Sequence, residues 1–156
     1  MAYSKFKRIL VALDDTPCSL QVMEYAKNLI VDGETSIALI TVVPPTSPAS
    51  YGADPLLGQQ PIVVPEVSEI QLSSAQEYLD RLAPNFASAK EIFTFTRIGS
   101  IREEILQVAQ EWSTDLLILG TNGKTGFEHF LSGSVSESVI RKAHCPVLVI
   151  PSKMED

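Results

Sequence analysis

Residues 115–134 read DLLILGTNGKTGFEHFLSGS, and this stretch carries the strongest indication of the fold. Its first part, up to Leu119, is a short apolar run typical of a strand that is buried on both faces of a parallel sheet. Four of the chain's eight glycines follow, namely Gly120, Gly123, Gly126 and Gly133. Glycine lets backbone N–H groups approach an anion closely, and the start of a following helix points unpaired N–H groups at the same anion. The stretch therefore predicts a strand, a phosphate-binding loop and a helix, with a nucleotide as ligand.

Similar apolar runs recur along the chain and alternate with stretches of helical period, as in βαβ units. Strands are expected at 8–14, 36–43, 91–97, 115–120 and 146–150, and helices at 16–31, 67–83, 101–112 and about 133–142. We expect one α/β domain over residues 1–156, built on an open, twisted, Rossmann-like sheet. The sheet should have five parallel strands in the order 3-2-1-4-5, with helices on both faces.

The helix ends and the buried helix faces can also be predicted. Thr16 is expected to cap the first helix with its hydroxyl, Pro17 to be its first residue and Gly33 to end it, while Pro84 stops the second helix. The residues expected to face the core are Leu20, Met23, Ala26 and Ile30 in the first helix, Ile70, Leu79 and Leu82 in the second, and Ile101, Ile105, Val108 and Trp112 in the third.

Composition limits the class of protein. The 156 residues are 45% apolar and 20% charged, which suits one globular domain. The net charge is −7 and the basic residues are scattered, which disfavours binding to nucleic acid. Cys18 and Cys145 match no metal-ligand spacing and no disulfide framework, which favours the cytoplasm. The apolar run at 9–13 is too short for a signal peptide or a membrane span, so no membrane association is expected.

The segment 44–65 contains six of the ten prolines, together with Gly52 and Gly58. This composition resists regular structure, and the segment is longer than ordinary connections in α/β domains. Two interpretations remain open at this point: a lid over a ligand, or a surface excursion that has no role in binding.

The glycine spacing separates three nucleotide-binding motifs. The dinucleotide motif should follow the first strand, but the turn at 14–17 contains no glycine. Gly123-Lys124-Thr125 is similar to the end of a Walker A loop, but Ile118 stands where that loop needs its first glycine. The pattern G-x2-G-x9-G-[ST] does fit, and it is filled by Gly120, Gly123, Gly133 and Ser134.

With this spacing the chain resembles the universal stress protein family, specifically its ATP-binding branch, over nearly its whole length. The stretch ILVALDDTPCSLQVMEYA at 9–26 looks like the family's first strand, aspartate and helix. TVVPP at 41–45 looks like the end of its second strand, and HCPVLVI at 144–150 looks like its last strand. The resemblance implies a fold like that of the adenine nucleotide alpha hydrolases, a cytoplasmic homodimer, and ATP as the ligand, with Mg²⁺ as a candidate companion.

The resemblance also implies roles for individual residues. Asp14 would hydrogen-bond the nucleoside, Val42 would meet the adenine ring through its main chain, and Gly120 would lie near the ribose. The phosphates would be held by Gly123, Gly133, Ser134, Val135 and Ser136. Ala12, Thr121 and Lys124 complete the implied set of nucleotide-binding residues.

Some of these side chains have a second interpretation. An ionised Asp14 can accept two charge-assisted hydrogen bonds from a ribose, but it could instead contact the turn at Thr16. Ser134 could donate to a phosphate, but Ser134-x-x-Glu137 is also a capping box that needs no ligand. Lys124 could lie against the phosphates or be a solvated loop lysine.

Hydrolysis of ATP would need a positioned base, a charge-neutralising clamp and usually metal ligands. The loop at 120–136 offers only Lys124, Glu128 and His129, and the last of these lies between two phenylalanines, as packed or surface residues do. The resemblance implies an ATP-binding regulatory module of the stress response, and the scarcity of catalytic groups in the loop predicts little or no hydrolysis. Two alternatives stay open: a slow ATPase or phosphotransferase that uses Lys124 and His129, and a dimeric scaffold that binds no nucleotide. The apolar strand at 147–150 is expected to form a sheet edge and to pair with its twin in a homodimer.

Overall fold

The computed structural model describes residues 6–45, 65–121 and 135–151. These residues form five strands, four α-helices and one 3₁₀ helix. In chain order they are β1 (Arg8–Ala12), α1 (Cys18–Asn28), β2 (Ser36–Val43), α2 (Pro65–Leu82), η3 (Ala83–Phe86), β3 (Ile92–Ile98), α3 (Ile101–Glu111), β4 (Leu116–Gly120), α4 (Val135–Lys142) and β5 (Val147–Ile150). The predicted alternation of strands and helices is confirmed, with strand ends shifted by one or two residues.

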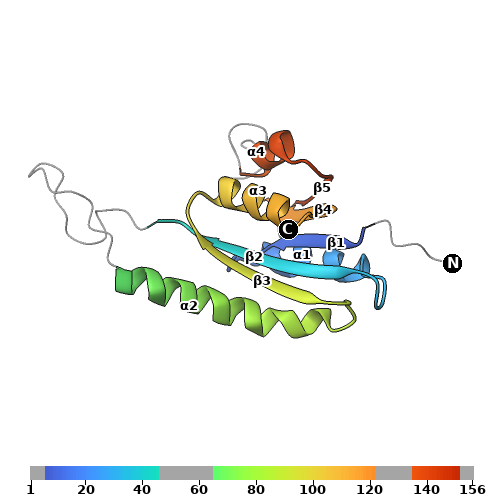
Figure 1. The fold of residues 1–156 in the computed structure, drawn as a ribbon, viewed down its shortest axis with the longest axis horizontal. Coiled ribbons are helices and arrows are strands. Elements are labelled where there is room, and N and C mark those ends of the chain that lie inside the picture. Colours follow the sequence, from blue (N-terminus) through green and yellow to red (C-terminus); the bar gives the residue numbers. More distant parts are fainter. Residues whose placement is uncertain (1–5, 46–64, 122–134, 152–156) are drawn as a thin grey trace, which may run out of the picture.

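The strands form one open parallel sheet in the order β3-β2-β1-β4-β5, which confirms the predicted order (Figure 1). The central strand β1 pairs with β2 on one side, where Ala12 lies opposite Ile40, and with β4 on the other, where Val11 lies opposite Ile118. From β1 the chain proceeds first toward β3 and later, through β4, toward β5. The strand order therefore reverses between β1 and β4, and in open α/β sheets ligands bind outside the carboxyl ends of the strands at this point.

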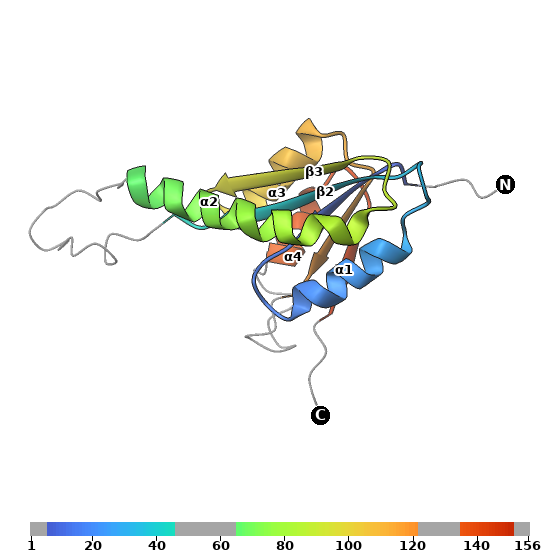
Figure 2. The same cartoon turned by 90° about the horizontal axis from the view of Figure 1, so that it is seen from below.

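Helices cover both faces of the sheet, α1 and α2 on one face and α3 and α4 on the other (Figure 2). Two buried clusters result. The α1 and α2 side includes Val22, Leu79 and Phe86, whereas the α3 and α4 side includes Val108 and Val139. Because β1 lies between the two clusters, its residues 9–11 are fully buried. This explains why the sequence of β1 is continuously apolar rather than alternating.

The first helix differs from the prediction at both ends. Its cap is Pro17, and the Thr16 hydroxyl donates to the Asp14 carboxylate instead of capping the helix. The helix ends at Asn28, well before Gly33, which adopts a φ of +70° in the following turn. The predicted burial of Leu20 is also wrong, because its side chain is 64% exposed. Ser19 takes the inward position, where its hydroxyl bonds to the turn after β1.

The second and third helices follow their predictions more closely. Leu79 is fully buried, but Ile70 is 65% exposed, because the start of α2 projects past the carboxyl ends of β2 and β3 in Figure 1. Near Pro84 the α-helix gives way to a 3₁₀ helix, because α2 ends at Leu82 and η3 follows directly. In α3 the predicted burial is confirmed for Ile105, Val108 and Trp112, whereas Ile101 at the first turn is 37% exposed.

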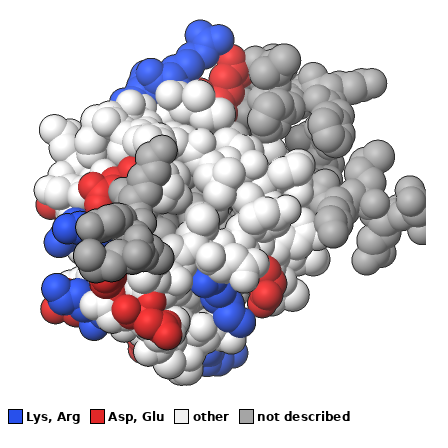
Figure 3. Space-filling view, turned by 90° about the vertical axis from the view of Figure 1, so that its right-hand side faces the viewer, with Lys and Arg blue, Asp and Glu red and all other residues white. Residues whose placement is uncertain are grey.

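The segment predicted to be irregular, 44–65, lies mostly outside the described residues, and the first turn of α2 begins at its last proline, Pro65. Figure 3 shows the face at the right of Figure 1, where Lys and Arg lie in separate small groups and form no continuous basic area. Of the helices in the described part of the chain, none combines the length and the apolar character that a membrane crossing requires.

Candidate functional site

The described candidate residues gather at the carboxyl edge of the sheet. Ala12 ends β1, Val42 lies one residue before the end of β2, and Gly120 ends β4. Asp14 and Thr121 follow the ends of β1 and β4, and Val135 and Ser136 form the start of α4. Gly123, Lys124, Gly133 and Ser134 lie outside the described residues, as does His129, so their roles stay predictions. The topology thus brings four separate parts of the chain, the ends of β1, β2 and β4 and the start of α4, to the same edge of the sheet.

Three hydroxyl groups hold Asp14 in the turn after β1. The Asp14 N–H donates to Ser19 Oγ at 2.9 Å, and Ser19 Oγ lies 2.7 Å from the Asp14 carbonyl oxygen and 3.0 Å from its Oδ1. The Thr16 hydroxyl also donates to Oδ1. The local contact to the Thr16 turn, left open above, is therefore present, and it is extended by Ser19.

The second carboxylate oxygen of Asp14 is in a different position. Among the residues that the structure describes, none donates to Oδ2, and the Asp14 side chain is exposed. Oδ1 is thus held by the chain's own hydroxyls, whereas Oδ2 accepts from none of the described residues. A carboxylate held in this way can accept a charge-assisted hydrogen bond from a ligand hydroxyl without losing its local contacts.

The third hydroxyl comes from α2. Tyr78 Oη donates to the Asp14 carbonyl oxygen at 2.6 Å, across 64 residues of sequence. Burial raises the pKa of the Tyr78 phenol above its ordinary value of 10.0; the hydrogen bond with Ser19 opposes this shift, and the carboxylates of Asp14 and Asp15 add to it. The phenol therefore stays protonated, and remains a donor, throughout the neutral range.

Val42 offers its main chain to the space beyond β1. The Leu13 N–H donates to the Ile40 carbonyl at 2.9 Å, so Ile40 faces β1, whereas Val43 accepts from Gly99 N–H on the β3 side. Peptide groups along a strand alternate between its two sides. The N–H and carbonyl of Val42 are therefore directed to the β1 side, past the residue where β1 ends. These two groups could pair with the donor and acceptor edge of a base.

Gly120 has a reason of its own to be glycine, apart from any ligand. A Cβ at this position would lie 2.6 Å from Cys18 Sγ and 3.0 Å from Val22 Cγ2, so the missing side chain lets α1 pack against β4. Its φ is not in the positive range, unlike those of Gly33 and Gly99. The conformational freedom inferred from the sequence is therefore not needed here; close packing is.

Beyond Gly120 the chain is tied to its neighbours. The Thr121 N–H donates to the Ile150 carbonyl at 3.0 Å, which continues the pairing of β4 with β5. Ser136 is buried, and its hydroxyl lies 3.5 Å from the Gly120 carbonyl, while Val135 packs on the α3 side of the core. These contacts hold the start of α4 against the end of β4. The helix therefore begins at the sheet edge, and the start of a helix favours an anion.

Cys18 lies just beneath this edge, between α1 and β4. Burial raises the pKa of its thiol above the ordinary value of 9.0, and the Asp14 carboxylate raises it further. A position in the first turn of a helix would by itself lower the pKa of a thiol. Desolvation and a nearby negative charge outweigh the helix end.

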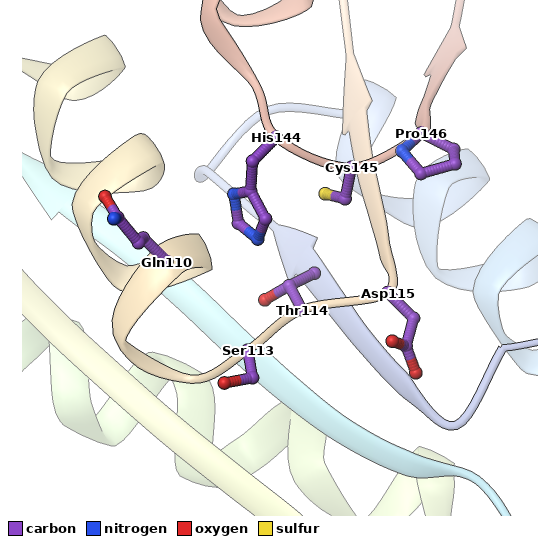
Figure 4. Close-up of a pocket in the computed structure, with 7 residues that line it drawn as sticks. All are labelled: Gln110, Ser113, Thr114, Asp115, His144, Cys145 and Pro146. Atoms are coloured by element: carbon purple, nitrogen blue, oxygen red, sulfur yellow. The ribbon is translucent and has the colours of Figure 1, made fainter.

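A shallow hollow lies at the opposite edge of the sheet, where β4 and β5 begin (Figure 4). His144 and Cys145 line it in the turn before β5, as turn residues at a strand entrance would. Asp115 belongs to its rim, but the carboxylate accepts hydrogen bonds from the main-chain N–H groups of Lys7 and Arg8, both at 3.0 Å. Within the described ranges no group of three or more His, Cys, Asp and Glu could hold a metal ion.

Comparison with known proteins decides the family. A model of the universal stress protein family matches residues 5–151 of the chain. The chain belongs to this family. Universal stress protein MJ0531 of Methanocaldococcus jannaschii is 33% identical over 146 residues, which cover 93% of this chain and 82% of the relative. Universal stress protein A homolog 2 of Coxiella burnetii is 33% identical over 151 residues, with 95% and 97% covered.

Solved structures show the same fold. Protein MJ0577 of Methanocaldococcus jannaschii superposes on this universal stress protein with a TM-score of 0.76 at 23% identity, covering 96% of this chain and 98% of its own. A universal stress protein in complex with cAMP gives 0.61 at 20% identity, with 95% and 98% covered. An Arabidopsis thaliana family protein with AMP bound gives 0.61 at 17% identity, with 94% and 92% covered.

Sequence reasoning missed two residues of the site, Ser19 and Tyr78. Ser19 left a weak signal, because a hydroxyl in the first turn of a helix often bonds to a neighbouring main-chain group. Tyr78 left none, because its contact with Asp14 depends on how α2 packs on the sheet. Both residues hold the universal stress protein's Asp14 turn in its observed shape.

Proposed function

We propose that this universal stress protein binds ATP at the carboxyl edge of its sheet and works in the cytoplasm as a nucleotide-dependent regulatory module. The observation that carries the proposal is the Asp14 carboxylate. It stands at the point where the strand order reverses, on an exposed residue, with Oδ1 held by two hydroxyls and no described residue donating to Oδ2. Two solved structures of the same fold contain AMP and cAMP, which supports an adenine nucleotide as the ligand.

Each group at this edge has a role in the proposal. Asp14 Oδ2 accepts a hydrogen bond from a ribose hydroxyl, and the Val42 main chain pairs with the adenine edge. The start of α4 presents N–H groups to the phosphates, together with the glycines between Gly120 and Ser134. Mg²⁺ remains a candidate companion of the phosphates, and if present it would neutralise part of their charge.

Isothermal titration calorimetry with ATP tests this proposal. The Asp14→Asn variant should lower the affinity for ATP by about 10- to 100-fold, the usual worth of a hydrogen bond to a charged group. Asp15→Asn is a matched control, since it removes the same charge one residue away and should leave the affinity nearly unchanged. Mass spectrometry of small molecules released from the denatured protein should find an adenine nucleotide. Absence of ATP binding to the wild-type protein would refute the proposal.

The proposal includes little or no hydrolysis. Release of phosphate from ATP should stay close to background for the wild-type protein. The alternative, a slow ATPase or phosphotransferase, would be favoured by clearly measurable turnover that the double variant Lys124→Ala, His129→Ala abolishes. That variant should leave the affinity for ATP within about tenfold if both residues are peripheral to binding.

We also propose that the protein is a homodimer through β5. This strand pairs with β4 on one side and forms an edge of the sheet on the other. Its residues 147–149 are apolar and only half-buried, and an apolar edge of this kind tends to pair with another chain. A second copy related by a two-fold axis would cover it. Light scattering should therefore give twice the monomer mass, and a monomer at working concentration would contradict this part of the proposal.

A further inference from the structure

Tyr78 connects α2 to the turn that carries Asp14. Its hydroxyl donates to the Asp14 carbonyl at 2.6 Å, and its ring packs against the core cluster on the α1 side of the sheet. The core therefore holds the ring in place, while the hydroxyl reaches the turn that carries Asp14. Tyr78 is the one residue of α2 whose side chain bonds to the Asp14 turn in the part of the chain that the structure describes.

Ser19 has fewer hydrogens to donate than it has acceptors around it. A serine hydroxyl has one hydrogen to donate. Besides Tyr78 Oη, two Asp14 acceptors lie within reach of it, the carbonyl oxygen at 2.7 Å and Oδ1 at 3.0 Å. Tyr78 also donates to the carbonyl oxygen, so this acceptor has a partner even when Ser19 turns its hydrogen to Oδ1. Without the Tyr78 hydroxyl, the shorter contact would draw the Ser19 hydrogen to the carbonyl.

We propose that Tyr78 is a positioning residue for the nucleoside. By donating to the Asp14 carbonyl, it leaves the Ser19 hydrogen for Oδ1, and this fixes the carboxylate with Oδ2 toward the ribose hydroxyls. The inference rests on the proposed function, because it assigns Asp14 to the ribose of ATP. It adds that the affinity for the ribose is set partly from α2, a helix that follows the proline-rich segment.

Calorimetry of Tyr78→Phe tests this role. The variant keeps the ring and removes the hydroxyl, and it should lower the affinity for ATP by about two- to tenfold, the usual worth of one hydrogen bond. Because the effect acts through the ribose, 2′,3′-dideoxy-ATP should bind wild-type and variant equally. Tyr25→Phe is the matched control: Tyr25 lies on α1 with its side chain 52% exposed, and its variant should bind both ligands as the wild type does.

A double-variant cycle tests the route through Ser19. In a Ser19→Ala background no hydroxyl remains to be redirected, so Tyr78→Phe should cause little further loss of affinity. Equal losses for ATP and 2′,3′-dideoxy-ATP, or full additivity with Ser19→Ala, would overturn the inference. Either result would mean that Tyr78 only supports the fold.

A ligand-free measurement separates this inference from the proposed function. The carboxyl ¹³C chemical shift of Asp14 at neutral pH should move in Tyr78→Phe and stay in place in Tyr25→Phe. If the wild-type protein fails to bind ATP, the proposed function fails, and the chemical shift still reports whether Tyr78 orients the carboxylate. If ATP binds and the chemical shift and the affinity for ATP are both unchanged in Tyr78→Phe, the inference alone is wrong.

Discussion

Gly120→Ala separates a packing role of this glycine from a role in ligand binding. The added Cβ would lie 2.6 Å from Cys18 Sγ and 3.0 Å from Val22 Cγ2. The first distance is far inside van der Waals contact, and Cys18 can move its sulfur only by rotating one side-chain bond or by shifting α1. We therefore expect the variant to destabilise the protein when no nucleotide is present.

The size of the effect can be worked out from two opposing terms. Overpacking a filled site costs about 1–3 kcal/mol of folding free energy. Replacing glycine by alanine returns about 0.4–1 kcal/mol, because the unfolded chain loses conformational freedom. The net loss is about 1–2 kcal/mol, which corresponds to a fall in Tm of about 2–8 °C for a domain of this size.

Urea denaturation of the ligand-free protein, followed by circular dichroism, measures this loss. Removing the sulfur should relieve the clash. Gly120→Ala should therefore cost much less stability in a Cys18→Ala background than in the wild-type protein. Gly33→Ala serves as a control. That residue has a φ of +70° and no atom within 4 Å of the added Cβ, so its loss comes from backbone strain and Cys18→Ala should not relieve it.

One result would refute the reasoning. If Gly120→Ala keeps the stability of the ligand-free protein but loses affinity for ATP, then the glycine serves the nucleotide and its contact with α1 is unimportant. Loss of both properties in the single variant, with both restored by Cys18→Ala, would show that packing of α1 controls the site.

Three further predictions concern the core, the thiols and the edge strand. Phe86→Ala should cost about 3–5 kcal/mol of stability in urea denaturation, because the side chain is fully buried; a loss below about 1 kcal/mol would contradict that burial. Burial raises the pKa of both thiols, so the folded state holds protons that the unfolded chain releases, and stability should be complete at neutral pH and fall as the pH rises past 9.0. The urea midpoint should therefore fall less steeply above pH 9.0 in Cys18→Ala and in Cys145→Ala than in the wild type. An unchanged slope in both variants would contradict a role of the thiols in this loss of stability. Val149→Lys should convert the proposed dimer to a monomer in light scattering, because two lysines would meet at the paired edges; an unchanged dimer mass would exclude β5 from the interface.

Much of the fold could be predicted from the sequence, because the signals are local. Apolar runs bounded by turns indicate buried strands, helical period indicates the covering helices, and right-handed crossovers restrict the possible strand orders. The strand order and the positions of all five strands are confirmed on this basis. The family could be recognised for the same reason, since the glycine spacing and the Asp14 turn are contiguous patterns.

What the tertiary structure decided depends on contacts between distant parts of the chain. Leu20 and Ile70 have the right period for burial, but the way α1 and α2 lie on the sheet leaves both exposed. The reason for glycine at position 120 is the approach of α1, and the Asp14 carbonyl accepts a hydrogen bond from a tyrosine 64 residues away. Periodicity specifies which face of an element is apolar, whereas only the packed molecule specifies which atoms that face meets.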